Sequence, residues 1–395
     1  MNKVLTNEAI TLLKDLISIS SFSGSEDKTA LRIQKWFTDH NIDYRRHNNN
    51  IYALNENFNK NKPMLLLNSH HDTVLPNKAY TKDPFHAHIE DGKLYGLGSN
   101  DAGGSLVSLI ALFTYYYNHP DPKYNIIIAA TAEEESSGNL GISSLLKILP
   151  KIDIAIVGEP TLMQLAVAEK GLVVIEAKIK GTASHAAHPN NNSAIEKLPA
   201  VLKWFKDFTF DKNSEILGPV KMTVTQVNAG EQHNVIPSEV DLVIDIRVND
   251  CYTNTDILNL LIENAPCEIK ARSLDLNSSS ISIKHELVKA GKKIGRKTYG
   301  SPTLSDQSKL NCPSIKLGPG DSRRSHTADE YIYIEEIIKG IELYTELLKQ
   351  IFSELKNISR INIDKLLKKI LIEIKTSKNR FDDKKTIMVK HLLQH

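Results

Sequence analysis

Histidine and carboxylate side chains stand where several apolar segments of the chain end. His70 and Asp72 end one such segment, the run Glu133–Glu135 ends a second, and Glu159 ends a third. Imidazole and carboxylate groups are the ligands that zinc, manganese and cobalt hydrolases use. If the fold brings these residues together, they would form a site for a divalent cation.

Two glycine-rich segments add further candidate ligands. Asp101 follows Gly96 and Gly98 just before a predicted helix, and glycine permits the tight backbone turn that would hold this carboxylate in place. His326 follows a second glycine-rich segment, 318–320, and also precedes a predicted helix. The three cysteines are scattered and form no CxxC pattern, so thiolates are excluded as metal ligands.

Each segment taken alone has a simpler explanation. His70 and Asp72 could form a hydrogen-bonded structural pair, and Asp101 could cap a helix or occupy a turn. The three glutamates could belong to a solvated loop, where water screens their mutual repulsion. Five segments that all deliver ligand-type side chains at strand ends or glycine-rich loops nevertheless favour a metal site.

The elements that must position these residues alternate between strands and helices. Uniformly apolar runs predict strands at 63–67, 125–131 and 152–157, and apolar residues at helical spacing predict helices at 103–117 and 139–148. Such alternation is typical of an α/β fold with a mainly parallel mixed sheet and helices on both faces. Side chains that follow parallel strands gather at the carboxyl edge of such a sheet.

The pattern changes after residue 171. Alternating residues predict a half-buried strand at 172–180, and further elements follow in the order β-α-β-β-α-β, which is typical of a ferredoxin-like α+β domain. The sequence therefore predicts a discontinuous catalytic domain, residues 1–171 and 285–352. The insertion, residues 172–284, is the predicted lid.

The end of the chain predicts two helices. Residues 331–351 have the spacing of a long helix. Residues 353–395 are rich in lysine, with isoleucine and leucine on one helical stripe, and predict an appended surface helix. A partner-binding or nucleic-acid tail is the alternative for this segment.

Charge and hydropathy exclude some classes of protein. The chain has 49 Lys and Arg against 47 Asp and Glu, so its overall charge gives no reason to expect nucleic acid as a partner. No stretch approaches the roughly eighteen apolar residues that a membrane span requires, and charged residues interrupt the first apolar segment. We therefore expect a cytoplasmic protein without a membrane partner.

The ordered set of motifs resembles the M20 family of metallopeptidases and deacylases over residues 5–350. The motifs are SHHDTV, GLGSNDAGG, TAEEESSG, VGEPT, GTASHAAHP, NVIP with DIR, and GPG followed by SHTADEYI. Acetylornithine deacetylase and succinyl-diaminopimelate desuccinylase belong to this family, whose members have a zinc-binding domain and an inserted lid that often dimerises. The resemblance implies two divalent ions, zinc or alternatively cobalt, and a homodimer formed through the lid.

The resemblance also implies a role for each motif residue of the catalytic domain. Five residues are expected to bind metal: His70 and Glu159 one ion, Glu135 and His326 the other, and Asp101 both. Asp72 would orient His70, and Glu134 would be the general base. Because three glutamates are consecutive, the base could be shifted by one position. The match of residues 132–137 to the deacetylase motif favours Glu134.

On the predicted lid, the resemblance implies three functional residues. His185 would reach a neighbouring active site and support the oxyanion. Asn234 and Arg247 would hold the substrate, the arginine by bidentate contact with a carboxylate. Ordinary lid surface is the alternative for all three. One departure in the catalytic domain is Gly103, which stands where many relatives have lysine.

The motifs are most similar to those of deacetylases in arginine biosynthesis. They predict hydrolysis of the N-acyl amide of a small-molecule amino acid, either N-acetyl-L-ornithine or N-acetyl- or N-succinyl-L-citrulline. Arg323 or Arg324 could pair with a substrate carboxylate, and a surface salt bridge is equally compatible. The alternatives are an N-acetyl-lysine deacetylase, a succinyl-diaminopimelate desuccinylase, an M20 dipeptidase, or a non-catalytic paralogue, which the intact ligand set opposes.

Overall fold

A computed structural model describes residues 3–119 and 123–352 of the 395-residue chain. The predicted tail helix lies outside the described residues. Contacts within the chain separate residues 1–347 from the segment 348–395, and the account below concerns the first unit. No helix in the described part of the chain is long and apolar enough to cross a membrane.

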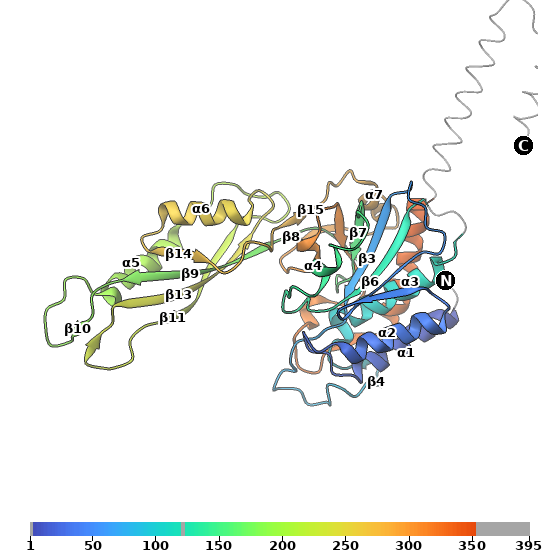
Figure 1. The fold of residues 1–395 in the computed structure, drawn as a ribbon, viewed down its shortest axis with the longest axis horizontal. Coiled ribbons are helices and arrows are strands. Elements are labelled where there is room, and N and C mark those ends of the chain that lie inside the picture. Colours follow the sequence, from blue (N-terminus) through green and yellow to red (C-terminus); the bar gives the residue numbers. More distant parts are fainter. Residues whose placement is uncertain (1–2, 120–122, 353–395) are drawn as a thin grey trace, which may run out of the picture. The chain divides into compact units, whose positions relative to one another are not determined.

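A mixed sheet forms the centre of the larger layered region (Figure 1). Within the described residues its hydrogen-bonded order is β1-β2-β6-β3-β7-β17-β8-β15, and β16 pairs with β8. The strands are β1 (Tyr44–His47), β2 (Asn50–Leu54), β3 (Met64–His70), β6 (Asn125–Thr131), β7 (Ile154–Val157), β8 (Leu165–Glu169), β15 (Ser279–Ser280), β16 (Thr298–Ser301) and β17 (Ser314–Lys316). The central strands β6, β3, β7 and β17 are parallel, as their apolar runs predict.

Helices cover both faces of this sheet. The helix α3 (Gly104–Tyr116) is buried on nearly every side and packs on β3 and β6, and α1 (Lys3–Ile17) packs on α3. The short helix α4 (Ile142–Leu145) covers the opposite face, where Ile142 and Leu145 contact Leu66 and Ile127. The prediction of an α/β fold with helices on both faces is confirmed. The helices α2 (Asp27–Asp39) and α7 (Glu286–Lys293), and a helix that begins at residue 334, also belong to this region.

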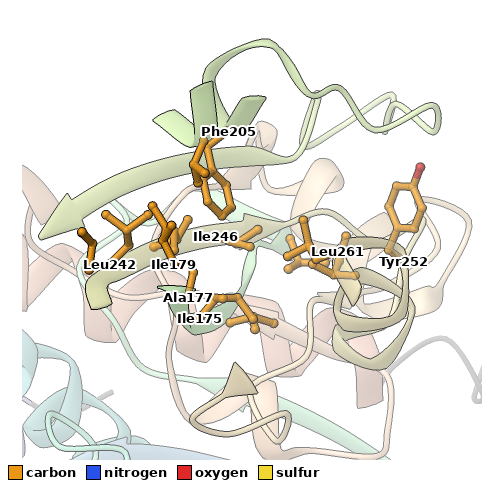
Figure 2. Packing of buried hydrophobic residues seen from close by; sticks show 14 of the residues in the cluster. Ile175, Ala177, Ile179, Phe205, Leu242, Ile246, Tyr252 and Leu261 are labelled. Carbon is orange, nitrogen blue, oxygen red and sulfur yellow. The ribbon is translucent and has the colours of Figure 1, made fainter. Parts of the chain in front are cut away.

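A second, four-stranded sheet lies within the predicted lid and is antiparallel throughout. Its order is β11-β13-β9-β14, formed by β9 (Gly171–Lys180), β11 (Lys221–Asn228), β13 (Glu239–Val248) and β14 (Glu268–Ala271). Alternate residues of β9 and β13, including Ile175 and Ile246, pack against Phe205 of α5 (Ala194–Asp207) and Leu261 of α6 (Asn254–Asn264) (Figure 2). Each fully buried side chain of this kind contributes about 1.5–3 kcal/mol to folding.

Two sequence predictions need correction at element ends. The predicted helix at 139–148 is helical only over α4, because Gly141 begins it and turns occupy the flanking residues. The predicted helix at 331–351 begins at residue 334, because β18 (Tyr331–Tyr333) instead pairs with β5 (Lys93–Tyr95) and so extends a small sheet with β4 (His88–Glu90). Backbone pairing with a distant strand overrides the helical pattern there.

Candidate metal centre

The carboxyl ends of the central parallel strands bring the predicted ligands together. His70 is the last residue of β3, Glu134 and Glu135 follow β6, and Glu159 follows β7. These strands are neighbours in the sheet, so residues that are far apart in the sequence meet at one edge. His326 reaches the same edge from the loop after β17.

Asp101 enters from a short turn, Ser99–Gly103, that leads into α3. The carboxylate of Glu330 accepts the backbone N–H groups of Gly98, Asn100 and Asp101 at 3.0, 2.8 and 2.9 Å. A side chain at Gly103 would place its Cβ 2.4 Å from the Gly98 carbonyl oxygen. Glycine therefore fits position 103, whereas any larger residue would require the backbone to shift.

The ligand atoms form two trios that share Asp101. His70, Asp101 and Glu159 form one, and Asp101, Glu135 and His326 form the other, with the atoms of each trio within 4.8 Å of one another. Asp101 Oδ1 lies 3.5 Å from His70 Nε2, and its Oδ2 lies 3.5 Å from His326 Nε2. One carboxylate thus offers a different oxygen to each histidine, as a bridging ligand does.

The charges of this cluster fit metal ions. His70 Nε2 is buried and has no hydrogen-bond partner among the described residues, so it is free to bind a cation. Burial, together with repulsion from Asp101, raises the pKa of Glu159 to about 8, and the bond to Glu135 raises the pKa of His326 to about 9. Buried carboxylates in such proximity require compensating positive charge, which two divalent ions would supply.

These shifts predict how pH affects the stability of metal-free protein. Burial raises the pKa values of Glu159 and Glu330 to about 8, and the pKa of His326 is raised to about 9. In the folded state these three side chains therefore keep their protons at pH values at which the unfolded chain has lost them. The folded state then binds more protons, so rising pH favours unfolding. Between about pH 6.5 and 8, the melting temperature of metal-free protein is therefore expected to fall.

Calorimetry of metal-stripped protein measures this trend. Because metal ions displace those protons, added zinc is expected to raise the melting temperature more at pH 8 than at pH 6. A melting temperature that rises between pH 6.5 and 8 without metal, or an equal effect of zinc at both pH values, would contradict the interpretation.

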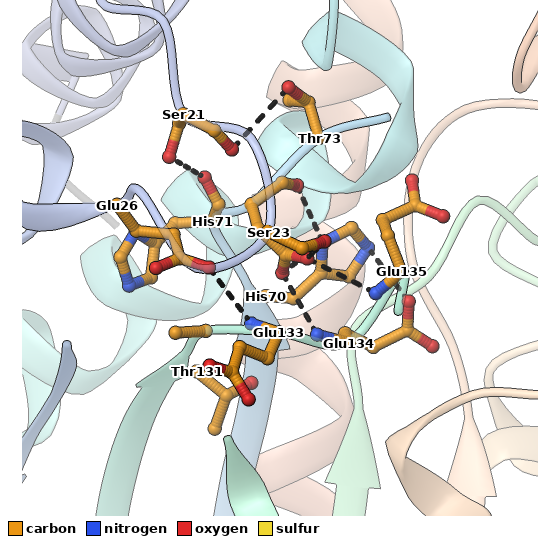
Figure 3. Close-up of polar contacts among 12 residues, drawn as sticks. Ser21, Ser23, Glu26, His70, His71, Thr73, Thr131, Glu133, Glu134 and Glu135 are labelled. Atoms are coloured by element: carbon orange, nitrogen blue, oxygen red, sulfur yellow. Dashed lines mark hydrogen bonds and ion pairs between the residues drawn. The ribbon is translucent and has the colours of Figure 1, made fainter. Parts of the chain in front are cut away.

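Asp72 contacts both His70 and the loop that carries the glutamates. His70 Nδ1 contacts the backbone oxygen of Asp72 at 2.9 Å, whereas the nearest carboxylate oxygen is 3.4 Å away. The Asp72 carboxylate instead accepts the N–H groups of Glu134 and Glu135, both at 3.1 Å, and the hydroxyl of Ser23 at 2.7 Å (Figure 3). Asp72 therefore orients the histidine through its main chain and the glutamate loop through its side chain.

The side chains of Glu134 and Glu133 point in different directions. Glu134 and Glu135 line a cavity of about 280 Å³ together with Asp101 and Glu159. The Glu133 carboxylate accepts the N–H of Leu140 at 2.9 Å, and Figure 3 shows it turned away from the two that follow. Burial and nearby carboxylates raise the pKa of Glu134, which increases its affinity for a proton.

Sequence reasoning missed Glu26, which it interpreted only as part of a helix start. Its side chain is fully buried and accepts hydrogen bonds from the backbone N–H of Glu133 at 3.3 Å and from Asn49 Nδ2 at 2.8 Å. Glu26 thus fixes the loop that carries Glu134, as Figure 3 shows. Neither Glu26 nor Glu330 follows a predicted strand or lies directly after a glycine-rich segment, so the patterns that indicated the candidate ligands did not indicate them.

The predicted lid residues make local contacts within the lid, and in the part of the chain that the structure describes none of them contacts the metal cluster. His185 lies on β10 (Ser184–His185), which pairs with β12 (Val235–Ile236), and the carbonyl oxygen of Asn234 accepts the N–H of Ala186. Arg247 forms an ion pair with Asp245 of its own strand at 2.9 Å. None of these contacts tests the functional roles of His185, Asn234 and Arg247, which stay predictions.

The two arginines after the glycine-rich loop are engaged in ion pairs. Arg323 contacts Asp321 at 2.6 Å with its side chain 84% exposed, and Arg324 contacts Glu336 at 2.7 Å. Arg324 also lies over the rings of Tyr331 and Tyr333. Arg323 therefore forms a surface ion pair, whereas the pair of Arg324, whose side chain is 13% exposed, is largely buried, and a role of either arginine in substrate binding stays a prediction.

Comparisons with known proteins agree with this site. Residues 66–350 match the model of Peptidase family M20/M25/M40. A succinyl-diaminopimelate desuccinylase of Ehrlichia ruminantium (strain Gardel) is 27% identical, with 88% of this chain and 98% of the relative covered. A [LysW]-lysine/[LysW]-ornithine hydrolase of Saccharolobus solfataricus is 26% identical, with 89% of this chain and 99% of the relative covered.

Solved structures have the same fold. A tripeptidase from Staphylococcus aureus superposes with a TM-score of 0.70 at 21% identity, covering 87% of this chain and 98% of the other. A dinuclear metal-binding M20 peptidase from Bacillus subtilis gives a TM-score of 0.67 at 15% identity, covering 89% and 99%. With its paired ligand trios and its family match over most of its length, the chain is an amide-bond hydrolase that belongs to peptidase family M20/M25/M40.

Proposed function

We propose that this protein releases a free amino acid from a small N-acyl amino acid, using two zinc ions or alternatively cobalt. The proposed substrate is N-acetyl-L-ornithine, or N-acetyl- or N-succinyl-L-citrulline, in arginine biosynthesis. The observation that carries the proposal is the pair of ligand trios joined by Asp101, with Glu134 beside them. Bound divalent ions would lower the pKa of water and polarise the scissile carbonyl.

The protein's own residues supply the positioning and the proton transfer. Glu134 would take a proton from the attacking water and deliver it to the departing amine. Its backbone is held by Asp72, and the preceding residue is held by Glu26, so the carboxylate remains directed at the cavity. The fixed geometry matters because general-base catalysis requires the base within hydrogen-bond reach of the proton.

A second substrate is favoured by a specific observation. Relatives with high coverage are named succinyl-diaminopimelate desuccinylase, which hydrolyses an amide of the same chemical type. N-succinyl-diaminopimelate is therefore the alternative substrate. For either substrate we also propose a cytoplasmic homodimer formed through the predicted lid, with His185, Asn234 and Arg247 contacting the substrate.

Amine release by metal-stripped protein, with and without added zinc or cobalt, tests the proposal. The panel is N-acetylornithine, N-acetylcitrulline, N-succinylcitrulline, N-acetyl-lysine and succinyl-diaminopimelate. We expect metal-dependent turnover of an ornithine or citrulline derivative. Turnover of succinyl-diaminopimelate or N-acetyl-lysine alone would retain the chemistry and replace the substrate, whereas no turnover by folded, metal-loaded protein would contradict the proposal.

A further inference from the structure

The active-site cavity has a second group of polar lining residues besides the metal ligands. We call Tyr299, Ser301, Thr303 and Lys316 the polar wall. Tyr299 and Ser301 belong to β16, and Lys316 is the last residue of β17. A lysine inside a buried strand is unusual, because an ammonium group away from water requires nearby partners.

Lys316 finds those partners in Glu169 and Thr303. Its side chain is 3% exposed, and Nζ lies 3.3 Å from Glu169 Oε2, 2.9 Å from the Thr303 carbonyl oxygen and 3.0 Å from Thr303 Oγ1. Glu169 is fully buried and also accepts the hydroxyl of Ser305 at 2.8 Å. A buried ion pair adds little net stability, but it restricts the groups that surround it to one arrangement.

This arrangement determines the direction of the hydrogen bonds that the Thr303 hydroxyl forms. An ammonium group has only hydrogens to donate, so Thr303 Oγ1 accepts from Lys316 and keeps its own hydrogen for another acceptor. Ser301 Oγ lies 3.0 Å away and can accept that hydrogen, or it can donate its own. Thr303 is exposed at the cavity, so an anionic ligand there would compete for its hydrogen.

Tyr299 provides a second donor on the same wall. Burial, with the nearby carboxylates of Glu159 and Asp321, raises its pKa to about 12. The phenol therefore keeps its hydrogen near neutral pH. Among the described residues its hydroxyl has no recorded hydrogen-bond partner, although it lines the cavity.

We propose that the polar wall binds a carboxylate of the substrate away from the scissile bond, with Thr303 and Tyr299 as donors and Lys316 and Glu169 as positioning residues. The inference rests on the proposed function, since it concerns the same cavity. The carboxylate can come from a dicarboxylic acyl group or from the amino-acid part of the substrate. Both sources present the same two oxygen acceptors.

Ligand binding to zinc-loaded protein tests the inference without requiring turnover. The probes are succinate and ornithine, which are the two possible product halves, and calorimetry gives their Kd values. We expect Thr303→Val to weaken one probe about ten-fold or more, as loss of a hydrogen bond to a charged group does, and Thr303→Ser to restore it. The affected probe identifies the source of the carboxylate. Unchanged Kd values, or no binding of either probe to the wild type, would overturn the inference.

A second variant separates positioning from simple stability. Lys316→Met with Glu169→Gln removes both charges together and leaves no unpaired buried ion. We expect the same loss of affinity as in Thr303→Val, and no further loss when the three changes are combined, because they remove one interaction. Additive losses would instead mean that the pair does not act through Thr303.

A matched control and the substrate panel complete the test. Thr225→Val removes a hydroxyl that is exposed on β11, outside the cavity, and is expected to leave both Kd values unchanged. If the probes respond as expected while no panel substrate is hydrolysed, only the proposed function fails. If a panel substrate is hydrolysed while the probes do not respond, only the polar wall fails.

Discussion

Glu134→Gln is expected to lower kcat by about a hundred- to ten-thousand-fold, the range that a general base contributes. Glutamine has nearly the same shape but cannot take a proton from water. Of the three consecutive glutamates, Glu134 lines the cavity but belongs to neither ligand trio. Burial raises the pKa of its carboxyl group, which favours its accepting a proton. Steady-state kinetics of zinc-loaded protein measures kcat, and elemental analysis of the same sample should show unchanged metal content.

Glu133→Gln is the matched control for that experiment. Its carboxylate bonds to the N–H of Leu140 and faces away from the cavity, so the same chemical change is expected to leave kcat within a few-fold of the wild type. This pair also tests the register of the three glutamates. Turnover of Glu134→Gln close to that of the wild type would show that another residue is the base.

Asp101→Asn is expected to weaken metal binding more than about 100-fold, which exceeds the usual effect of losing a residue that only supports a ligand. Asparagine keeps one oxygen but loses the negative charge and the second oxygen that reaches His326. Neither trio then has its shared carboxylate. Competition with a coloured chelator gives the affinities, and elemental analysis after dialysis gives the number of bound ions.

The control for this variant is Asp91→Asn. Asp91 lies in an exposed turn with a positive φ of 49°, a conformation that asparagine tolerates as well as aspartate does. Metal content and turnover are expected to remain as in the wild type. Two ions bound to Asp101→Asn with unchanged affinity would show that Asp101 is not a bridging ligand.

The sequence predicted which candidate ligands lie together better than it predicted the residues that support them. His70, Glu135 and Glu159 follow strands, and parallel strands bring their carboxyl ends together whatever the details of packing. Glu26 and Glu330 act on backbone N–H groups of distant segments, and no sequence spacing records such a contact. Their role depends on loop conformations that only the folded chain defines.

Lys316 did leave a signal in the sequence. It stands between Ile315 and Leu317, and a lysine that is buried among apolar residues must find an acidic partner. The partner could not be chosen from the sequence, because β8 and β17 become neighbours only through the sheet topology. Likewise, the strand at Tyr331–Tyr333 could not be told from a helix start, since its partner strand is more than two hundred residues earlier.

The position of β17 between β7 and β8 has a consequence for how the protein matures on the ribosome. At about 5–20 residues per second, roughly 10–30 s pass between the synthesis of Glu159 and that of His326. During this interval the nascent chain has one complete ligand trio and part of the other, and β7 lacks a neighbour in the sheet. Both ligand trios can therefore be complete only after residue 326 has been synthesised and β17 has joined β7.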